Sequence, residues 1–105
     1  MVSIKTFRQL AMSFAEVVEL PHFEKISFRI GKKIFATLAE KNNTAVVKLT
    51  LIDQSVFCAF DETIIFPVAG AWGKKGFTGI NLKKIKKAML KDALACAYEE
   101  VAKKK

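Results

Sequence analysis

Apolar side chains near the N-terminus recur every three or four positions. They are Phe7, Leu10, Ala11, Phe14 and Val18. This spacing places them on one face of an amphipathic helix. Ser3 or Thr6 can cap its first turn, because a hydroxyl accepts a hydrogen bond from an unpaired amide there. We therefore expect a helix at this end of the chain, with Pro21 lying beyond its end.

Residues 26–30 instead alternate apolar and polar side chains, which predicts a strand. The pair Gly31-Lys32 supplies a tight turn into a second strand at residues 34–38. A cluster of turn-forming residues at 41–44 then leads into a third strand at residues 45–51. Because short turns join these strands, we expect the sheet to be antiparallel.

The second half of the chain predicts two further strands and two helices. Asp53 can cap a short helix with three side chains facing the core: Val56, Phe57 and Phe60. A fourth strand covers residues 64–66 and ends at Pro67, and a fifth covers residues 77–82. Asn81 is expected to cap a long C-terminal helix whose inward residues are Ile85, Met89, Ala93, Leu94, Ala97 and Val101. The fold class is α+β, an antiparallel meander of about five strands with helices on one face.

Length and composition favour one globular domain over residues 1–105. Hydrophobic residues make up 51% of the chain, and it contains no repeat or low-complexity tract. Its longest apolar runs are too short to cross a membrane and nothing resembles a signal peptide, so we expect a cytoplasmic protein without a membrane partner. Two cysteines, Cys58 and Cys96, sit at apolar helix positions, where a free thiol behaves as a small hydrophobe. The sequence leaves the oligomeric state open.

Positive charge is concentrated toward the C-terminus. Residues 1–70 carry eight basic and seven acidic side chains, whereas residues 71–105 carry ten basic and three acidic ones. The whole chain has a formal charge of +8. Such a one-sided field attracts polyanions such as nucleic acid, although lysines also serve simply to keep a small protein soluble.

A glycine-rich segment, residues 70–79, combines four glycines with aromatic and basic side chains. Trp72 and Phe77 flank Lys74 and Lys75, so that rings and ammonium groups alternate. This pattern suits contact with phosphates and stacked bases. It equally suits a twisted hairpin whose two rings pack in the protein's own core.

A second basic cluster lies where the last helix is expected to begin. Lys83, Lys84, Lys86 and Lys87 crowd the positive end of the helix dipole, where cations are unfavourable and a bound anion would offset the cost. Lys84, Lys87 and Lys91 would share one helix face. The alternative is a lysine-rich surface that tolerates this small cost.

Three stretches together resemble the MmcQ/YjbR-like family: Pro21-His22-Phe23, residues 28–36 and residues 70–78. The resemblance covers nearly the whole chain in order. It implies an α+β fold related to that of frataxin, with hairpins in a double-wing arrangement. Members are commonly labelled DNA-binding. Many relatives carry tryptophan at the position of Phe77, so this chain lacks an indole donor there.

Carried over to this chain, the resemblance points to DNA contact by two segments. They are the hairpin turn with Lys32 and Lys33, and the glycine-rich segment with Trp72, Lys74, Lys75 and Phe77. Arg8 and Arg29 are the only arginines, so bidentate reading of bases is not expected and binding should be electrostatic and tolerant of sequence. The alternative is a non-enzymatic module that binds a protein or a small anion in a groove beside Trp72.

Catalytic and metal-binding patterns are weak. His22 is the only histidine, and a dyad with Cys58 would require the two side chains to meet in space. One histidine and two separated cysteines match no zinc-ligand spacing. The carboxylate pairs Asp61-Glu62 and Glu99-Glu100 are too sparse for an iron site. We therefore expect a protein that is not an enzyme and that uses no metal or cofactor.

Overall fold

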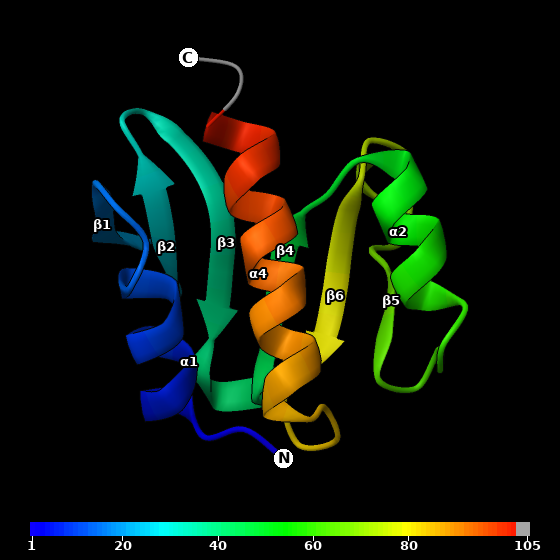
Figure 1. The fold of residues 1–105 in the computed structure, drawn as a ribbon. Helices are drawn as coiled ribbons and strands as arrows, with labels where there is room; N and C mark the ends of the chain where they lie inside the picture. The colour runs from blue at the N-terminus through cyan, green and yellow to red at the C-terminus, as the bar shows by residue number, and fades with distance from the viewer. Residues whose placement is uncertain (103–105) are drawn as a thin grey trace.

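A computed structural model describes residues 1–102 and shows one six-stranded sheet with helices on one of its faces (Figure 1). All neighbouring strands are antiparallel, in the order β1-β2-β3-β4-β6-β5. The elements are α1 (Ile4–Met12), β1 (Val17–His22), β2 (Lys25–Ile30), β3 (Lys33–Ala39), the 3-10 turn η1 (Glu40–Asn42), β4 (Thr44–Lys48), α2 (Leu51–Cys58), β5 (Ile65–Pro67), α3 (Ala71–Lys74), β6 (Phe77–Asn81) and α4 (Lys87–Ala102). The α+β class and the helices on one face are confirmed. The sheet has one strand more than predicted, and β6 lies between β4 and β5, so only its first four strands form a meander.

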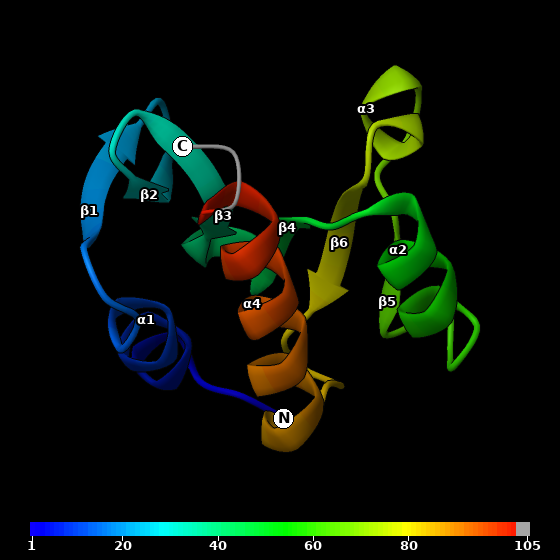
Figure 2. The ribbon, with the colours of Figure 1, turned by 45° about the horizontal axis from the view of Figure 1, so that its top comes forward.

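The main core lies between the sheet and the two helices α1 and α4. Phe7 of α1 packs edge-on against Phe28 of β2, with ring centroids 5.7 Å apart. Val47 of β4 and Leu94 of α4 are also fully buried. Figures 1 and 2 show α1 and α4 side by side on this face, while no helix within residues 1–102 covers the opposite face.

The extra strand comes from a stretch predicted to be helical. α1 ends at Met12, and Val18 lies in strand β1, at the edge of the sheet. Glu16 takes a positive φ of 64°, which a helix cannot continue through. Beyond it, pairing with β2 satisfies the backbone hydrogen-bonding groups, and Pro21 is tolerated because an edge strand leaves one side unpaired.

The helix α2 begins earlier than predicted and presents a different face to the protein. Thr50 is its N-cap, and the Thr50 hydroxyl accepts a 3.0 Å hydrogen bond from the backbone N–H of Asp53. Val56 and Phe60 are 67% and 68% exposed, so their predicted burial is wrong, whereas Phe57 packs against the core. The buried residue of α2 is Gln54.

The exposed side of α2 carries no charged residue. Its members are Leu51, Ile52, Ser55, Val56, Ala59 and Phe60, the last two just beyond the helix. The spacing of these apolar residues does not place them in the core. The side of α2 that faces the protein is occupied by Gln54, whose side-chain amide donates a buried hydrogen bond to the carbonyl of Gly73. Helical periodicity finds the apolar face but not the direction in which it points.

A matched pair of valine variants tests this orientation. We expect Val56→Ala to change the free energy of unfolding by no more than about 0.5 kcal/mol, as exposed positions do. Val47→Ala should cost about 2 kcal/mol or more, because Val47 is fully buried and a cavity would remain. Urea denaturation followed by circular dichroism measures both. Equal losses at the two positions would contradict the orientation of α2.

The long helix α4 begins six residues later than Asn81, its predicted cap. Asn81 instead holds a separate turn: its side-chain oxygen accepts from the N–H of Lys83 at 3.0 Å, and its carbonyl accepts from Ile85. The buried face of α4 agrees with the prediction at Ala93, Leu94, Ala97 and Val101. Ile85 is also buried, although it precedes the helix, and Met89 is half-buried.

Candidate functional site

The glycine-rich segment is packed tightly against neighbouring backbone. Gly73 lies in α3 and is buried against the backbone carbonyl of Val68, where a Cβ would collide. Gly76 takes a φ of +102°, and a Cβ there would meet the carbonyl of Leu49. The two glycines therefore let backbone segments approach closely. Their role in this structure is close packing.

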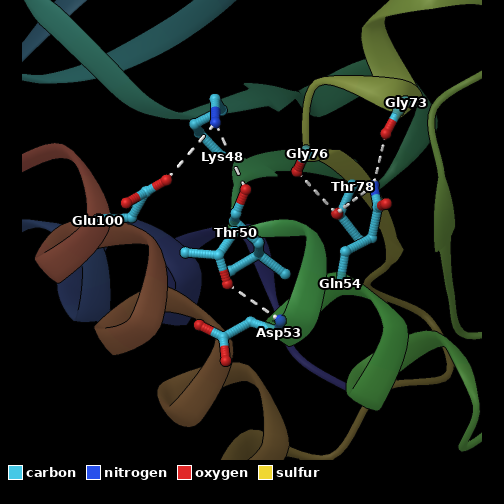
Figure 3. A network of polar contacts seen from close by, with 9 residues as sticks. Lys48, Thr50, Asp53, Gln54, Gly73, Gly76, Thr78 and Glu100 are labelled. Carbon is cyan, nitrogen blue, oxygen red and sulfur yellow. Dashed lines mark hydrogen bonds and ion pairs between the residues drawn. The ribbon is translucent and has the colours of Figure 1, made fainter.

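The side chain of Gln54 in α2 holds the glycine-rich segment in place through hydrogen bonds (Figure 3). Its side-chain amide donates to the carbonyl oxygen of Gly73 at 2.9 Å, to that of Phe77 at 3.2 Å, and to the hydroxyl of Thr78 at 3.2 Å. The Thr78 hydroxyl in turn donates to the carbonyl of Gly76 at 3.0 Å. Because the sites are buried, losing these bonds would leave backbone carbonyls short of partners. Nothing in the sequence singles out Gln54, since a glutamine in a short helix ordinarily faces solvent.

Trp72 projects from the glycine-rich segment into solvent. The side chain is 60% exposed, so the alternative of core packing is wrong for Trp72; Phe77 is half-buried. The two rings meet edge to face, with centroids 5.3 Å apart and planes 84° apart. The ammonium of Lys75 lies 5.3 Å from the Trp72 ring centroid, and that of Lys48 lies 5.8 Å from the Phe77 ring centroid. Both distances are within the range of cation–π attraction.

A groove of about 490 Å³ brings the hairpin turn and the glycine-rich segment together. We call this hollow the basic groove. It is lined by His22, Lys32, Lys33, Ile34, Thr37, Lys48, Trp72, Phe77, Glu100 and Val101. Residues about forty positions apart in the sequence thus share one surface. Four of the predicted contact residues, Lys32, Lys33, Trp72 and Phe77, lie on it.

Lys48 and Glu100 join the end of β4 to the end of α4 at this groove (Figure 3). The Lys48 ammonium lies 3.8 Å from a Glu100 carboxylate oxygen, and both side chains are largely buried, at 21% and 15% exposure. The ammonium also donates to the backbone carbonyl of Leu49 at 3.4 Å. Sequence reasoning missed Lys48, which reads only as a charge interrupting an apolar strand.

The remaining predicted contact residues lie elsewhere. Lys74 is exposed on α3 and Lys75 lies over the Trp72 ring, but neither lines the groove. Lys84 precedes α4 and lines a different hollow, next to Asp61, and Lys91 lines a third, next to Phe14. Lys87 is exposed where α4 begins.

The helix face predicted for Lys84, Lys87 and Lys91 is wrong, because the turn held by Asn81 keeps Lys84 out of the helix. Lys87 also lies fourteen residues from Val101 along α4, which corresponds to roughly 21 Å of helix. Figure 2 likewise shows α3 at the end of the molecule opposite to the start of α4. The second basic cluster therefore stands apart from the groove.

No cysteine–histidine dyad forms. His22 ends β1, at one edge of the sheet, whereas Cys58 ends α2, which packs on β5 at the other edge. Burial raises the pKa of the Cys58 thiol, with a smaller contribution from the charge of Glu62, so little reactive thiolate is present at neutral pH. Among residues 1–102, no three His, Cys, Asp or Glu side chains gather closely enough to hold a metal ion.

Comparison with known proteins supports the resemblance found in the sequence. The crystal structure of the Deinococcus radiodurans protein DR2400, which contains the domain DUF419, superposes with a TM-score of 0.84 at 18% identity, over 99% of this chain and 81% of that one. This likeness establishes the fold. No curated protein matches the chain. No helix within the described part of the chain is both long and apolar enough to span a membrane. The model of the YjbR family matches residues 12–100, which include every strand of the sheet and the whole basic groove except Val101, and the chain therefore belongs to the YjbR family.

Proposed function

We propose that the basic groove binds DNA, through its phosphates and without reading its sequence. The observation that carries this proposal is the exposure of Trp72 on the same groove as Lys32, Lys33 and Lys48. An exposed indole offers a flat apolar face on which a base can stack, and lysines around it favour an anionic partner. The DNA-binding label of the family that the chain resembles points in the same direction.

We expect binding to tolerate any DNA sequence, because the side chains of both arginines are engaged within the protein. The Arg8 guanidinium is held by Glu19 through two hydrogen bonds, of 3.1 Å and 2.7 Å. Arg29 is half-buried in the sheet and donates to the Ser27 hydroxyl at 2.9 Å. Neither is placed to form the bidentate contact with guanine that usually specifies a base. Lysines, which act as point charges on phosphates, remain for binding.

A salt titration tests the proposal. We expect binding of arbitrary duplex DNA to weaken steeply with salt, with a log–log slope near −0.9 per phosphate contacted, or near −3.6 for about four contacts. Fluorescence anisotropy of a labelled duplex at several salt concentrations measures the slope. An affinity that does not change with salt, or no binding at about 0.05 M salt, would remove nucleic acid as the partner.

The volume of the groove favours a second candidate function, the binding of a small phosphorylated molecule without catalysis. At about 490 Å³ it falls within the range of small-molecule pockets, roughly 300–1,000 Å³. His22 and Lys32 are the polar groups that would receive such an anion, since Lys48 is already paired with Glu100. Saturable binding of a phosphorylated metabolite, with a weak dependence on salt and no binding of DNA, would support this candidate instead.

A further inference from the structure

We infer that the basic groove is built for unpaired nucleotides, so that the protein prefers a single strand to a duplex. This inference rests on the proposed function and specifies its ligand. It is carried by the state of the two aromatic rings: one is exposed, both are held in place, and both have a lysine ammonium beside them.

The rings are preorganised before any ligand arrives. Trp72 stands on α3, whose Gly73 is packed against Val68, and the Gln54 amide fixes the carbonyls of Gly73 and Phe77. The edge-to-face contact with Phe77 further limits how Trp72 can turn. A ring fixed in this way loses little conformational freedom when a base stacks on it, and binding is correspondingly stronger.

Binding to phosphates alone would not require the exposed ring of Trp72. A duplex presents its sugar-phosphate backbone, while its bases are already stacked on one another and are not available to a protein ring. Lysines would be enough for such a ligand. An indole that is 60% exposed gains a partner only when a base is unpaired, because stacking then covers an apolar face of both groups.

The surrounding charges fit the same ligand. The ammonium of Lys75, which lies 5.3 Å from the Trp72 ring centroid, can meet the phosphate of a nucleotide stacked on that ring, whereas the ammonium of Lys48 is already paired with Glu100. Lys32, on the hairpin turn, extends the positive surface along the groove and can meet the next phosphate. A strand therefore gains contacts that a free mononucleotide, with its single phosphate, lacks.

The test uses the emission of Trp72, the only tryptophan in the chain. We would titrate the protein with oligothymidylate of about twelve nucleotides, with a duplex of equal length and with thymidine monophosphate, at one salt concentration. We expect the single strand to quench the emission and to bind at least about tenfold more tightly than the other two. Trp72→Ala, followed by anisotropy, should weaken single-strand binding about 5- to 160-fold and leave duplex binding within about twofold. Phe23→Ala, at an aromatic ring that is 96% exposed outside the groove, is the matched control and should change neither.

The possible results separate the two proposals. Equal affinity for strand and duplex, with unchanged Trp72 emission, would overturn the preference for unpaired nucleotides and leave DNA binding in place. Thymidine monophosphate that binds as tightly as the strand would replace the strand with a free nucleotide as the ligand. If neither strand nor duplex binds at about 0.05 M salt, the proposed function itself fails.

Discussion

Gly76→Ala is expected to lower the free energy of unfolding by about 2–6 kcal/mol, through backbone strain and overpacking together. Gly76 adopts a φ of +102°, which alanine disfavours, and a Cβ would meet the carbonyl of Leu49. The two backbones cannot separate freely, because the N–H of Leu49 donates to the carbonyl of Gly76 at 2.9 Å. Since small domains are stable by only about 5–15 kcal/mol, this one methyl group should remove a large part of the total. Urea denaturation followed by circular dichroism measures it.

Gly31 provides the matched control. It has a similar positive φ, of +62°, but apart from its two chain neighbours no residue has an atom within 4 Å of the position its Cβ would occupy. Gly31→Ala should therefore show the cost of strain alone, about 1–2 kcal/mol. If Gly76→Ala proves no more destabilising than Gly31→Ala, close packing of the glycine-rich segment on Leu49 is not what Gly76 provides.

Replacing Lys32 and Lys75 together by alanine is expected to weaken DNA binding on the order of 50-fold at about 0.1 M salt, and to reduce the log–log salt slope by about two units. Lys32 lines the basic groove on the hairpin turn, and Lys75 lies over Trp72. Each is expected to neutralise one phosphate and release its counterion. Anisotropy titrations at several salt concentrations give both quantities.

Lys84→Ala with Lys91→Ala removes the same total charge from surfaces outside the groove. This control should keep the salt slope and change the affinity by no more than about twofold. All four lysines are exposed, so folding should be preserved in both variants, which thermal melts would verify. Equal losses from the two double variants would mean that net charge, and not the groove, determines binding.

The sequence predicted well wherever neighbouring residues decide the structure. The alternating pattern at residues 26–38 and the Gly31 turn correspond to the observed β2–β3 hairpin, in which Gly31 has the expected positive φ. The turn cluster at residues 41–44 contains Asn43 in the left-handed conformation. Such features depend on short-range sterics and hydrogen bonds, which the residue types themselves carry.

The predictions failed where the local sequence pattern fits two structures equally well, such as a helix and a strand, or burial of either side of a helix. Val18 has helical spacing to Phe14, yet it forms part of β1 because β2 offers it a partner strand. α2 has apolar residues on several sides, and burial of the Gln54 amide decides which of them faces solvent. Asn81 can cap a helix or a turn, and the packing of Ile85 into the core favours the turn.

For the candidate site, too, some features could be predicted from the sequence and others only from the tertiary structure. The sequence pattern alone singled out Trp72 and Phe77 as rings that suit a nucleic acid, because the chemistry of rings and ammonium groups does not depend on the fold, and the family resemblance added Lys32 and Lys33. Only the tertiary structure decided that these four line one groove, that Trp72 is exposed, that Lys48 joins them, and that Lys84, Lys87 and Lys91 do not. The physical reason is that a groove is formed by segments that meet through sheet pairing and buried hydrogen bonds, here β3 with β4, β4 with β6, and Gln54 with Gly73. Those long-range contacts depend on the whole fold, and no local pattern in the chain records them.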